Sequence, residues 1–283
     1  MDAWLRRGLR AGHPEFAALL ERPDAQVDLA EAALLVARDA YPGLVVEDYR
    51  ARLDAMAAEA AGDLDPDAGP DTRLAALVAW YVAAGFRGNL SDYYDPRNSY
   101  LNEVMDRRLG IPITLGLVLL EVGRRLGIAL TPIGLPGHVV LGWAGPGEPF
   151  WLDPFHPQTR MTEEDCRRRV EGVYGRSLTW NPGWLAPLTP RTFLVRLLNN
   201  LRGAHLARGE TASLIPVLEK MLLLAPTELS LLREVGLLHL DAGRVGLGGR
   251  YLEYYLEHAP PSLDHAALVR RLQQEVSRVA RRN

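Results

Sequence analysis

A histidine and an aspartate stand in two short β-prone runs near the middle of the 283-residue chain. His138 begins the run 138–143, and Asp153 directly follows the run 149–152. A carboxylate that fixes the tautomer of an imidazole lets that imidazole activate a neighbouring nucleophile. Because short strands joined by Gly-Pro turns pair side by side, we take these two residues as the candidate catalytic pair.

An apolar helix is predicted directly before these strands, over residues 113–126. Leu115, Leu119 and Val122 follow the i, i+4, i+7 spacing of a buried helix. Pro112 fits the first helical position, where its missing N–H costs nothing. A nucleophile at such a helix N-terminus, then a strand with histidine and a strand with aspartate, is the arrangement of papain-like and transglutaminase-like triads. In those triads the helix N-terminus lowers the pKa of a cysteine.

Four segments of the chain resemble the SirB-type proteins, in which a transglutaminase-like domain precedes tetratricopeptide-like repeats. The matching segments are YDPRNSYLN at 94–102, RLGIPITL at 108–115, LPGH at 135–138 and LDPF at 152–155. Together with a helical N-terminus and C-terminal repeats, the resemblance covers most of the chain. It implies a papain-like core, but the biochemical activity of that family is poorly defined.

The resemblance also assigns positions within the triad. His138 matches the triad histidine and Asp153 the triad aspartate, whereas Pro112 stands where active transglutaminases have their cysteine. A proline side chain carries no nucleophile, and acyl transfer without one loses its covalent intermediate. The resemblance therefore implies a pseudoenzyme, in which the histidine and aspartate tie two strands together.

Three alternatives could restore catalysis. Thr114 carries a hydroxyl two positions into the same helix, although threonine is usually a capping residue there. Cys166, the single cysteine, could be delivered from its own helix, although cysteine is commonly a small buried hydrophobe. His138, Asp153 and His156 could hold a metal ion that activates water, but their spacing is loose. We assign no metal site and no cofactor.

Polar residues gather just before the predicted buried helix and could line a cleft beside the histidine. We predict a binding role for Asn98, Tyr100, Asn102 and Arg108, since amide and guanidinium groups recognise carboxylates and peptide backbone. The alternative is that Asn98 caps a helix and the neighbouring arginines are solvated or ion-paired.

The last ninety residues repeat with a period of thirty-four residues, which is typical of tetratricopeptide helix–turn–helix units. The recurring pairs are Gly209 and Gly243, Ala225 and Ala259, Pro226 and Pro260, and His205 and His239. Gly236 and Gly248 are predicted to let the two helices of the second unit approach closely. The repeated histidines are interpreted as packing residues, and a final helix over 264–281 is predicted to cap the array.

These patterns predict an α+β protein in three parts. Residues 1–88 form a helical N-terminal part of the core domain, 89–186 a transglutaminase-like core with a small antiparallel sheet, and 187–283 an all-α tetratricopeptide-like domain. Short helices are expected in the first sixty residues, and residues 62–71 are expected to form a loop or a helix start.

Composition excludes several classes of function. A net charge of −3 provides no basic surface for nucleic acid, and a single lysine, Lys220, removes any phosphate loop ending in GK. The motifs GxSxG and HExxH are absent, as are an apolar run of eighteen residues and a secretory signal. We therefore expect a cytoplasmic protein that contacts neither nucleic acid nor membrane.

The predicted function is non-catalytic binding of a protein or peptide partner, through the repeat groove or the former catalytic cleft, in a regulatory role. The alternative is a hydrolase or acyltransferase that acts on amide bonds with a non-standard nucleophile or a metal-bound water.

Overall fold

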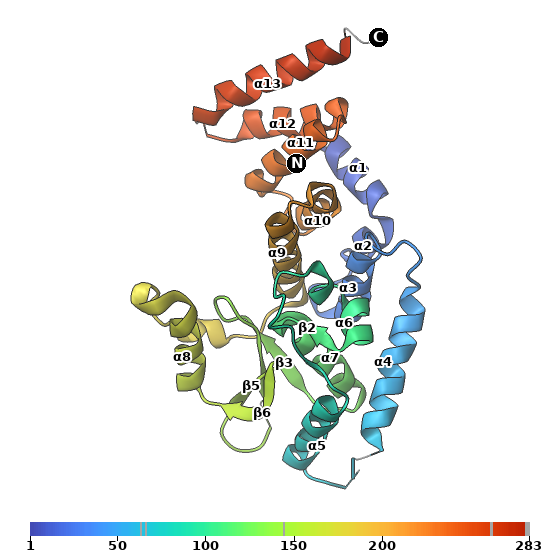
Figure 1. Ribbon diagram of the computed structural model, residues 1–283, viewed down its shortest axis with the longest axis vertical. Helices are drawn as coiled ribbons and strands as arrows, with labels where there is room; N and C mark the ends of the chain where they lie inside the picture. Colours follow the sequence, from blue (N-terminus) through green and yellow to red (C-terminus); the bar gives the residue numbers. More distant parts are fainter. Residues whose placement is uncertain (63, 66, 144, 261–262, 281–283) are drawn as a thin grey trace. The chain divides into compact units, whose positions relative to one another are not determined.

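The computed structural model describes every residue except 63, 66, 144, 261–262 and 281–283 (Figure 1). Its internal contacts divide the chain into two compact units. The core unit is Asp24–Leu197, and the repeat unit joins Met1–Pro23 to Leu198–Asn283. This division differs from the boundaries expected at 88 and 186, because the first twenty-three residues belong with the C-terminal helices. The expected loop positions Asp63 and Pro66 and the expected helix end Arg281 lie outside the described residues.

Helices make up most of the core unit. They are α3 (Leu29–Ala37), α4 (Val46–Ala61), α5 (Pro70–Ala83), α6 (Leu101–Arg107), α7 (Pro112–Arg125), α8 (Glu163–Tyr174) and the first part of α9 (Pro190–Arg208). Helix α7 lies at the centre, in contact with α3, α4, α5, α6 and two strands of the sheet (Figure 1). Its apolar residues Leu115, Leu117, Val118, Leu119 and Val122 are fully buried. The predicted buried helix is therefore confirmed.

Both ends of α7 follow from local sequence. Pro112 is the first helical residue, as predicted, and the Thr114 hydroxyl accepts the backbone N–H of Ile111 at 3.3 Å. At the other end Gly127 adopts φ 68°, a left-handed conformation that glycine reaches without steric cost. Arg124 and Arg125 stand in the last turn, where positive charge is favourable.

A four-stranded antiparallel sheet follows α7. Its strands, in spatial order, are β3 (Leu130–Ile133), β4 (Val140–Trp143), β5 (Phe150–Asp153) and β6 (His156–Met161). The first three match the predicted strands, while β6 was not predicted from the sequence. A short parallel pair, β1 (Arg87–Gly88) with β2 (Leu109–Gly110), lies beside the start of α7.

Helix α8 packs on this sheet through an apolar face. Thr162 and Asp165 form a capping box at its start. Cys166 and Val170, one turn apart, join a buried cluster that includes Val140 of β4 and Met161 of β6. The remaining side of α8 carries charged residues.

The repeat unit is entirely helical in its described residues. It contains α1 (Ala3–Gly12), α2 (Pro14–Leu19), the rest of α9, α10 (Thr211–Leu224), α11 (Leu229–Asp241), α12 (Val245–His258) and α13 (Leu263–Ala280). A Cβ added to Gly248 of α12 would lie 2.7 Å from the carbonyl oxygen of Gly236 in α11. The predicted close approach of these two helices at glycine is therefore confirmed.

The N-terminal segment joins the repeat unit through apolar and polar contacts. Helix α1 contacts α10, and Leu5, Leu9 and Phe16 are buried. The Met1 amino group donates to the Tyr254 hydroxyl at 2.6 Å. These contacts explain why a segment at the start of the chain belongs with helices near its end.

Charged side chains are buried inside the repeat unit. His13 Nε2 lies 3.0 Å from Glu219 Oε2, and His239 Nε2 lies 3.3 Å from Glu219 Oε1. Burial opposes ionisation of Glu219, but the two imidazoles outweigh it and lower its pKa to about 2. Lys220 Nζ lies 3.0 Å from His13 Nδ1. His205 and His239 are both buried, in keeping with the packing role predicted for them.

The α+β class predicted from sequence is confirmed by a mostly helical chain with one small antiparallel sheet. Among the residues described, no helix is both long and apolar enough to cross a membrane.

Candidate functional site

The structure brings His138 and Asp153 together, as predicted from their strands. His138 ends a turn in which its N–H donates to the carbonyl of Leu135 at 3.1 Å, just before β4. Asp153 is the last residue of the neighbouring β5. Imidazole Nε2 lies 3.0 Å from carboxylate Oδ1, a close contact whose direction falls short of hydrogen-bond geometry. Both side chains are nearly buried.

The Asp153 carboxylate contacts two further groups besides the imidazole. Its Oδ1 accepts the backbone N–H of Phe155 at 2.9 Å, and its Oδ2 pairs with Arg169 of α8. Burial opposes ionisation of the carboxyl, but His138, the Phe155 N–H and Arg169 outweigh it and lower its pKa. Arg169 therefore shares the carboxylate that an active triad reserves for its imidazole.

Arg169 was not identified from the sequence, although a signal for it exists. It stands three residues after Cys166, on the side of α8 that faces the sheet. Three consecutive arginines, 167–169, look alike in the sequence, and only the phase of the helix distinguishes the one that reaches Asp153.

A second arginine holds the turn before His138. Arg196 of α9 donates to the backbone carbonyls of Gly134 at 3.3 Å and His138 at 2.9 Å, and also to that of Leu135. Burial lowers the pKa of Arg196, but its guanidinium still satisfies several carbonyl groups at once. Gly137 adopts φ 69° within the same turn. The imidazole is therefore presented by a backbone fixed from α9.

No described side chain at the start of α7 offers a nucleophile to the imidazole. Pro112 occupies the position assigned to the cysteine, and its side chain is buried. Thr114 is fully buried, and its hydroxyl donates to the carbonyl of Asn98 at 2.6 Å, with the Ile111 carbonyl at 3.2 Å. The expected capping role of Thr114 is confirmed.

Cys166 lies in the apolar cluster beneath α8. Its side chain is fully buried, and burial, together with Asp165 and Glu163, raises the pKa of the thiol to about 12. A thiol is nucleophilic only as thiolate, so Cys166 is a packing residue at neutral pH.

Phe155 lies against the imidazole. The two rings meet edge to face with centroids 6.2 Å apart. A Cβ at Gly88 would lie 2.9 Å from carbon atoms of the Phe155 ring, so a side chain there would force that ring to shift. Phe155 thus packs between β1 and His138.

A metal site formed with His138 and Asp153 would need the His156 side chain beside them. His156 begins β6 and is the register partner of Asp153, but its side chain is exposed. Within the described part of the chain, no group of three His, Cys, Asp or Glu side chains is placed to hold a metal ion.

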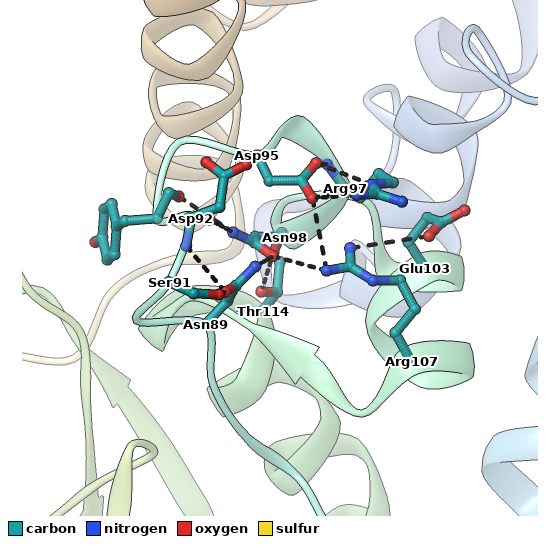
Figure 2. A network of polar contacts seen from close by, with 10 residues as sticks. Asn89, Ser91, Asp92, Asp95, Arg97, Asn98, Glu103, Arg107 and Thr114 are labelled. Atoms are coloured by element: carbon teal, nitrogen blue, oxygen red, sulfur yellow. Dashed lines mark hydrogen bonds and ion pairs between the residues drawn. The ribbon is translucent and has the colours of Figure 1, made fainter.

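A buried polar network precedes α7 (Figure 2). The Asn98 amide nitrogen donates to the carbonyls of Asp92 at 2.8 Å and Tyr93 at 3.2 Å. Its oxygen accepts from Asn89 at 3.0 Å and from Arg107 at 3.3 Å. Asn98 therefore organises the loop 89–98 rather than capping a helix.

The other predicted binding residues also lie inside the core unit. Tyr100, the N-cap residue of α6, is buried, and its ring meets that of Tyr41 edge to face with centroids 5.5 Å apart. Asn102 is buried, and its side-chain oxygen has no hydrogen-bond partner among the described residues. The Arg108 guanidinium lies 4.5 Å from the centre of the Phe86 ring. Asn98, Tyr100 and Asn102 are buried and Arg108 is half-buried, and a binding role for them stays a prediction.

Comparison with known proteins identifies the family of the chain. A family model described as "Transglutaminase-like superfamily" matches residues 47–199, just over half of the chain. The chain belongs to the transglutaminase-like superfamily. A second model, described as "Tetratricopeptide repeat", matches residues 201–274. The domain order implied by the SirB-type resemblance is thereby confirmed.

Two relatives of this transglutaminase-like chain match most of its length, and a third matches a shorter part. A UPF0162 protein of Xylella fastidiosa is 32% identical over 87% of the chain and 89% of that protein. UPF0162 protein PA3419 of Pseudomonas aeruginosa is 30% identical over 70% of the chain and 72% of its own length. F-box only protein 21 of Mus musculus is 35% identical over 30% of the chain, but over only 15% of its own length. No solved structure matches the chain with significance.

Proposed function

We propose that this transglutaminase-like chain is a non-catalytic binding protein, which recognises a protein or peptide partner in the cytoplasm and acts as a regulator. The observation that carries the proposal is the place of Pro112 at the first position of α7. A cysteine there would have the helix dipole to stabilise its thiolate, whereas a proline offers no attacking atom.

The polar groups beside His138 support the same proposal. The carboxylate of Asp153 is shared among an imidazole, a backbone N–H and Arg169, and its pKa is lowered by these contacts. A carboxylate neutralised by a guanidinium gives less support to an imidazolium that must form during catalysis. The pair is therefore suited to tying β4 to β5.

The alternative, an amide-bond hydrolase or acyltransferase, requires an attacking group near the imidazole. The Thr114 hydroxyl is engaged with the carbonyls of Asn98 and Ile111, and the Cys166 thiol is buried with a raised pKa. Neither group favours the alternative.

The repeat unit supports partner binding. Tetratricopeptide arrays present extended surfaces that bind other proteins. Three large apolar side chains are exposed on the described helices of this unit: Trp4 in α1, Leu206 in α9 and Val269 in α13, with 50%, 50% and 40% of their surface accessible. Exposed apolar residues on a repeat array are candidates for partner contacts.

The test is quantitative capture of partners by the tagged full-length chain after mild crosslinking. We expect at least one protein to be enriched more than tenfold over an untagged control, and Leu206→Glu or Val269→Glu to reduce its capture several-fold. Glu253→Gln, an exposed charge change on α12, is the matched control and should leave capture unchanged. Absence of any enriched partner, or equal capture by all variants, would contradict the proposal.

A further inference from the structure

A pocket of about 590 Å³ opens in the core unit between β6 and α8. Its polar lining consists of Asp153, His156, Thr159, Asp165, Arg168 and Arg169. Two of these side chains are carboxylates and two are guanidiniums, so the side-chain charges of the pocket balance when histidine is neutral. What such a pocket can bind depends on which of its polar atoms are already engaged.

The carboxylate oxygens of the pocket are engaged. Asp153 receives the Phe155 N–H on Oδ1 and Arg169 on Oδ2. Asp165 Oδ1 accepts a hydrogen bond from the Arg168 guanidinium at 2.6 Å, and its Oδ2 accepts one from the Thr162 hydroxyl at 2.7 Å. Each of these four oxygens therefore already accepts a hydrogen bond or ion pair, which reduces the acceptor capacity left for a cationic ligand.

The donors of the pocket are in excess. A guanidinium carries five N–H donors, and in the described part of the chain Arg169 pairs with Asp153 and Arg168 with Asp165, each through one terminal nitrogen. The Arg169 side chain is 36% exposed and that of Arg168 65% exposed. The Thr159 hydroxyl adds a further donor to the lining.

We propose that this pocket binds a ligand carboxylate, held by the guanidinium groups of Arg169 and Arg168 with the hydroxyl of Thr159. A planar two-oxygen anion matches the fork of an arginine, and charge-assisted pairs of this kind are the strong ones. Because Asp153 and Asp165 stand in the same pocket, a single negative charge is tolerated better than two, which disfavours a phosphate dianion.

The apolar lining limits the rest of the ligand. Met161 and Val173 flank the polar side chains, so the group next to the carboxylate should be a short apolar one. A small carboxylic acid and the C-terminus of a peptide both present this chemistry. The site does not depend on the proposed partner binding, since a small acid would occupy it with or without a protein partner.

Titration calorimetry on the full-length chain tests the proposal with four probes. They are 4-methylpentanoate, an N-acetylated tripeptide ending in leucine, the C-terminal amide of that tripeptide, and inorganic phosphate. We expect saturable binding of one or both free acids and at least tenfold weaker binding of the amide and of phosphate. Binding of 4-methylpentanoate alone identifies a small-acid site, and binding of the free tripeptide identifies a peptide C-terminus.

Three variants test the assignment to this pocket. Arg169→Gln should weaken binding of the free acids at least tenfold, and Thr159→Val about threefold. Thr159 is exposed on β6, so its variant keeps the test valid if Arg169→Gln fails to fold. Arg167→Gln, on the same helix but outside the lining, is the matched control and should bind normally.

Lack of binding by both free acids, phosphate binding of equal strength, or normal binding by the Thr159 variant would overturn the proposal. Calorimetry tests carboxylate binding and crosslinking capture tests partner binding, so failure of one proposal is distinguishable from failure of the other.

Discussion

The Thr114 hydroxyl donates a hydrogen bond to the backbone carbonyl of Asn98 at 2.6 Å, inside the fully buried start of α7. The same oxygen accepts the N–H of Ile111 at 3.3 Å. Asn98 in turn binds the carbonyls of Asp92 and Tyr93 through its side chain, so one hydroxyl links the first turn of α7 to the loop 89–98 (Figure 2). The residue that could have replaced the missing nucleophile is thus a structural link.

Replacing Thr114 by valine should destabilise the chain. The change keeps the side-chain shape but leaves the Asn98 carbonyl and the Ile111 N–H without this partner in a buried site, at a cost of about 1–3 kcal/mol. Urea unfolding measures the free energy, and Thr114→Ser, which keeps the hydroxyl, is the control and should lose less. Equal stability of the valine variant and the wild type would argue against the structural link.

The contact of α11 with α12 predicts opposite effects for two neighbouring glycines. A Cβ at Gly248 would meet the Gly236 carbonyl and the backbone of Leu240, so Gly248→Ala should cost about 1–3 kcal/mol through overpacking. Gly246 of the same helix has open space around it, and Gly246→Ala should be neutral or stabilising by up to about 1 kcal/mol. Thermal unfolding of both variants measures the difference, and a stable Gly248→Ala protein would contradict the observed packing.

Glu219 predicts a defined pH dependence. Contacts with His13 and His239 lower its pKa from 4.5 to about 2, so the ionised carboxylate stabilises the folded chain above the unfolded pKa. The contribution is about 3 kcal/mol, and it is lost as the pH falls from about 4.5 toward 2. The stability difference between wild type and Glu219→Gln, from urea unfolding at each pH, should shrink over this window. A difference that is constant from pH 7 to pH 2.5 would exclude the linkage.

Cys166 should react slowly in the folded protein. Its pKa of about 12 leaves almost no thiolate at neutral pH, and its side chain is fully buried. A thiol-directed reagent at pH 8 should label the native chain at least a hundredfold more slowly than the chain in guanidinium chloride. Equally rapid labelling of both would instead indicate an accessible, activated thiol.

Much of the core unit is predictable from the sequence, because apolar spacing and helix-start residues mark its elements locally. The apolar spacing after Pro112 predicts α7, and Pro112 itself marks the first residue of that helix. Strand β6 was not predicted because only Pro157 and Met161 of its six residues are buried, so its sequence HPQTRM reads as a polar loop.

The parts of the site that the sequence left open depend on tertiary contacts. His138 and Asp153 were predicted to meet because neighbouring strands bring them together, but nothing local marks Arg196 of α9 as the residue that holds the His138 turn. Residues 1–23 are another example. Sequence patterns group them with the core, whereas their packing against α10 assigns them to the repeat unit.

We propose that the histidine and aspartate of this transglutaminase-like chain support structure and not turnover. The most direct measurement is the rate of peptide hydrolysis and of amine incorporation into glutamine side chains, with and without a chelator, for wild type and His138→Ala. We expect no rate above the buffer blank for either protein, and a lower unfolding free energy for His138→Ala. Turnover by the wild type that His138→Ala abolishes would contradict it.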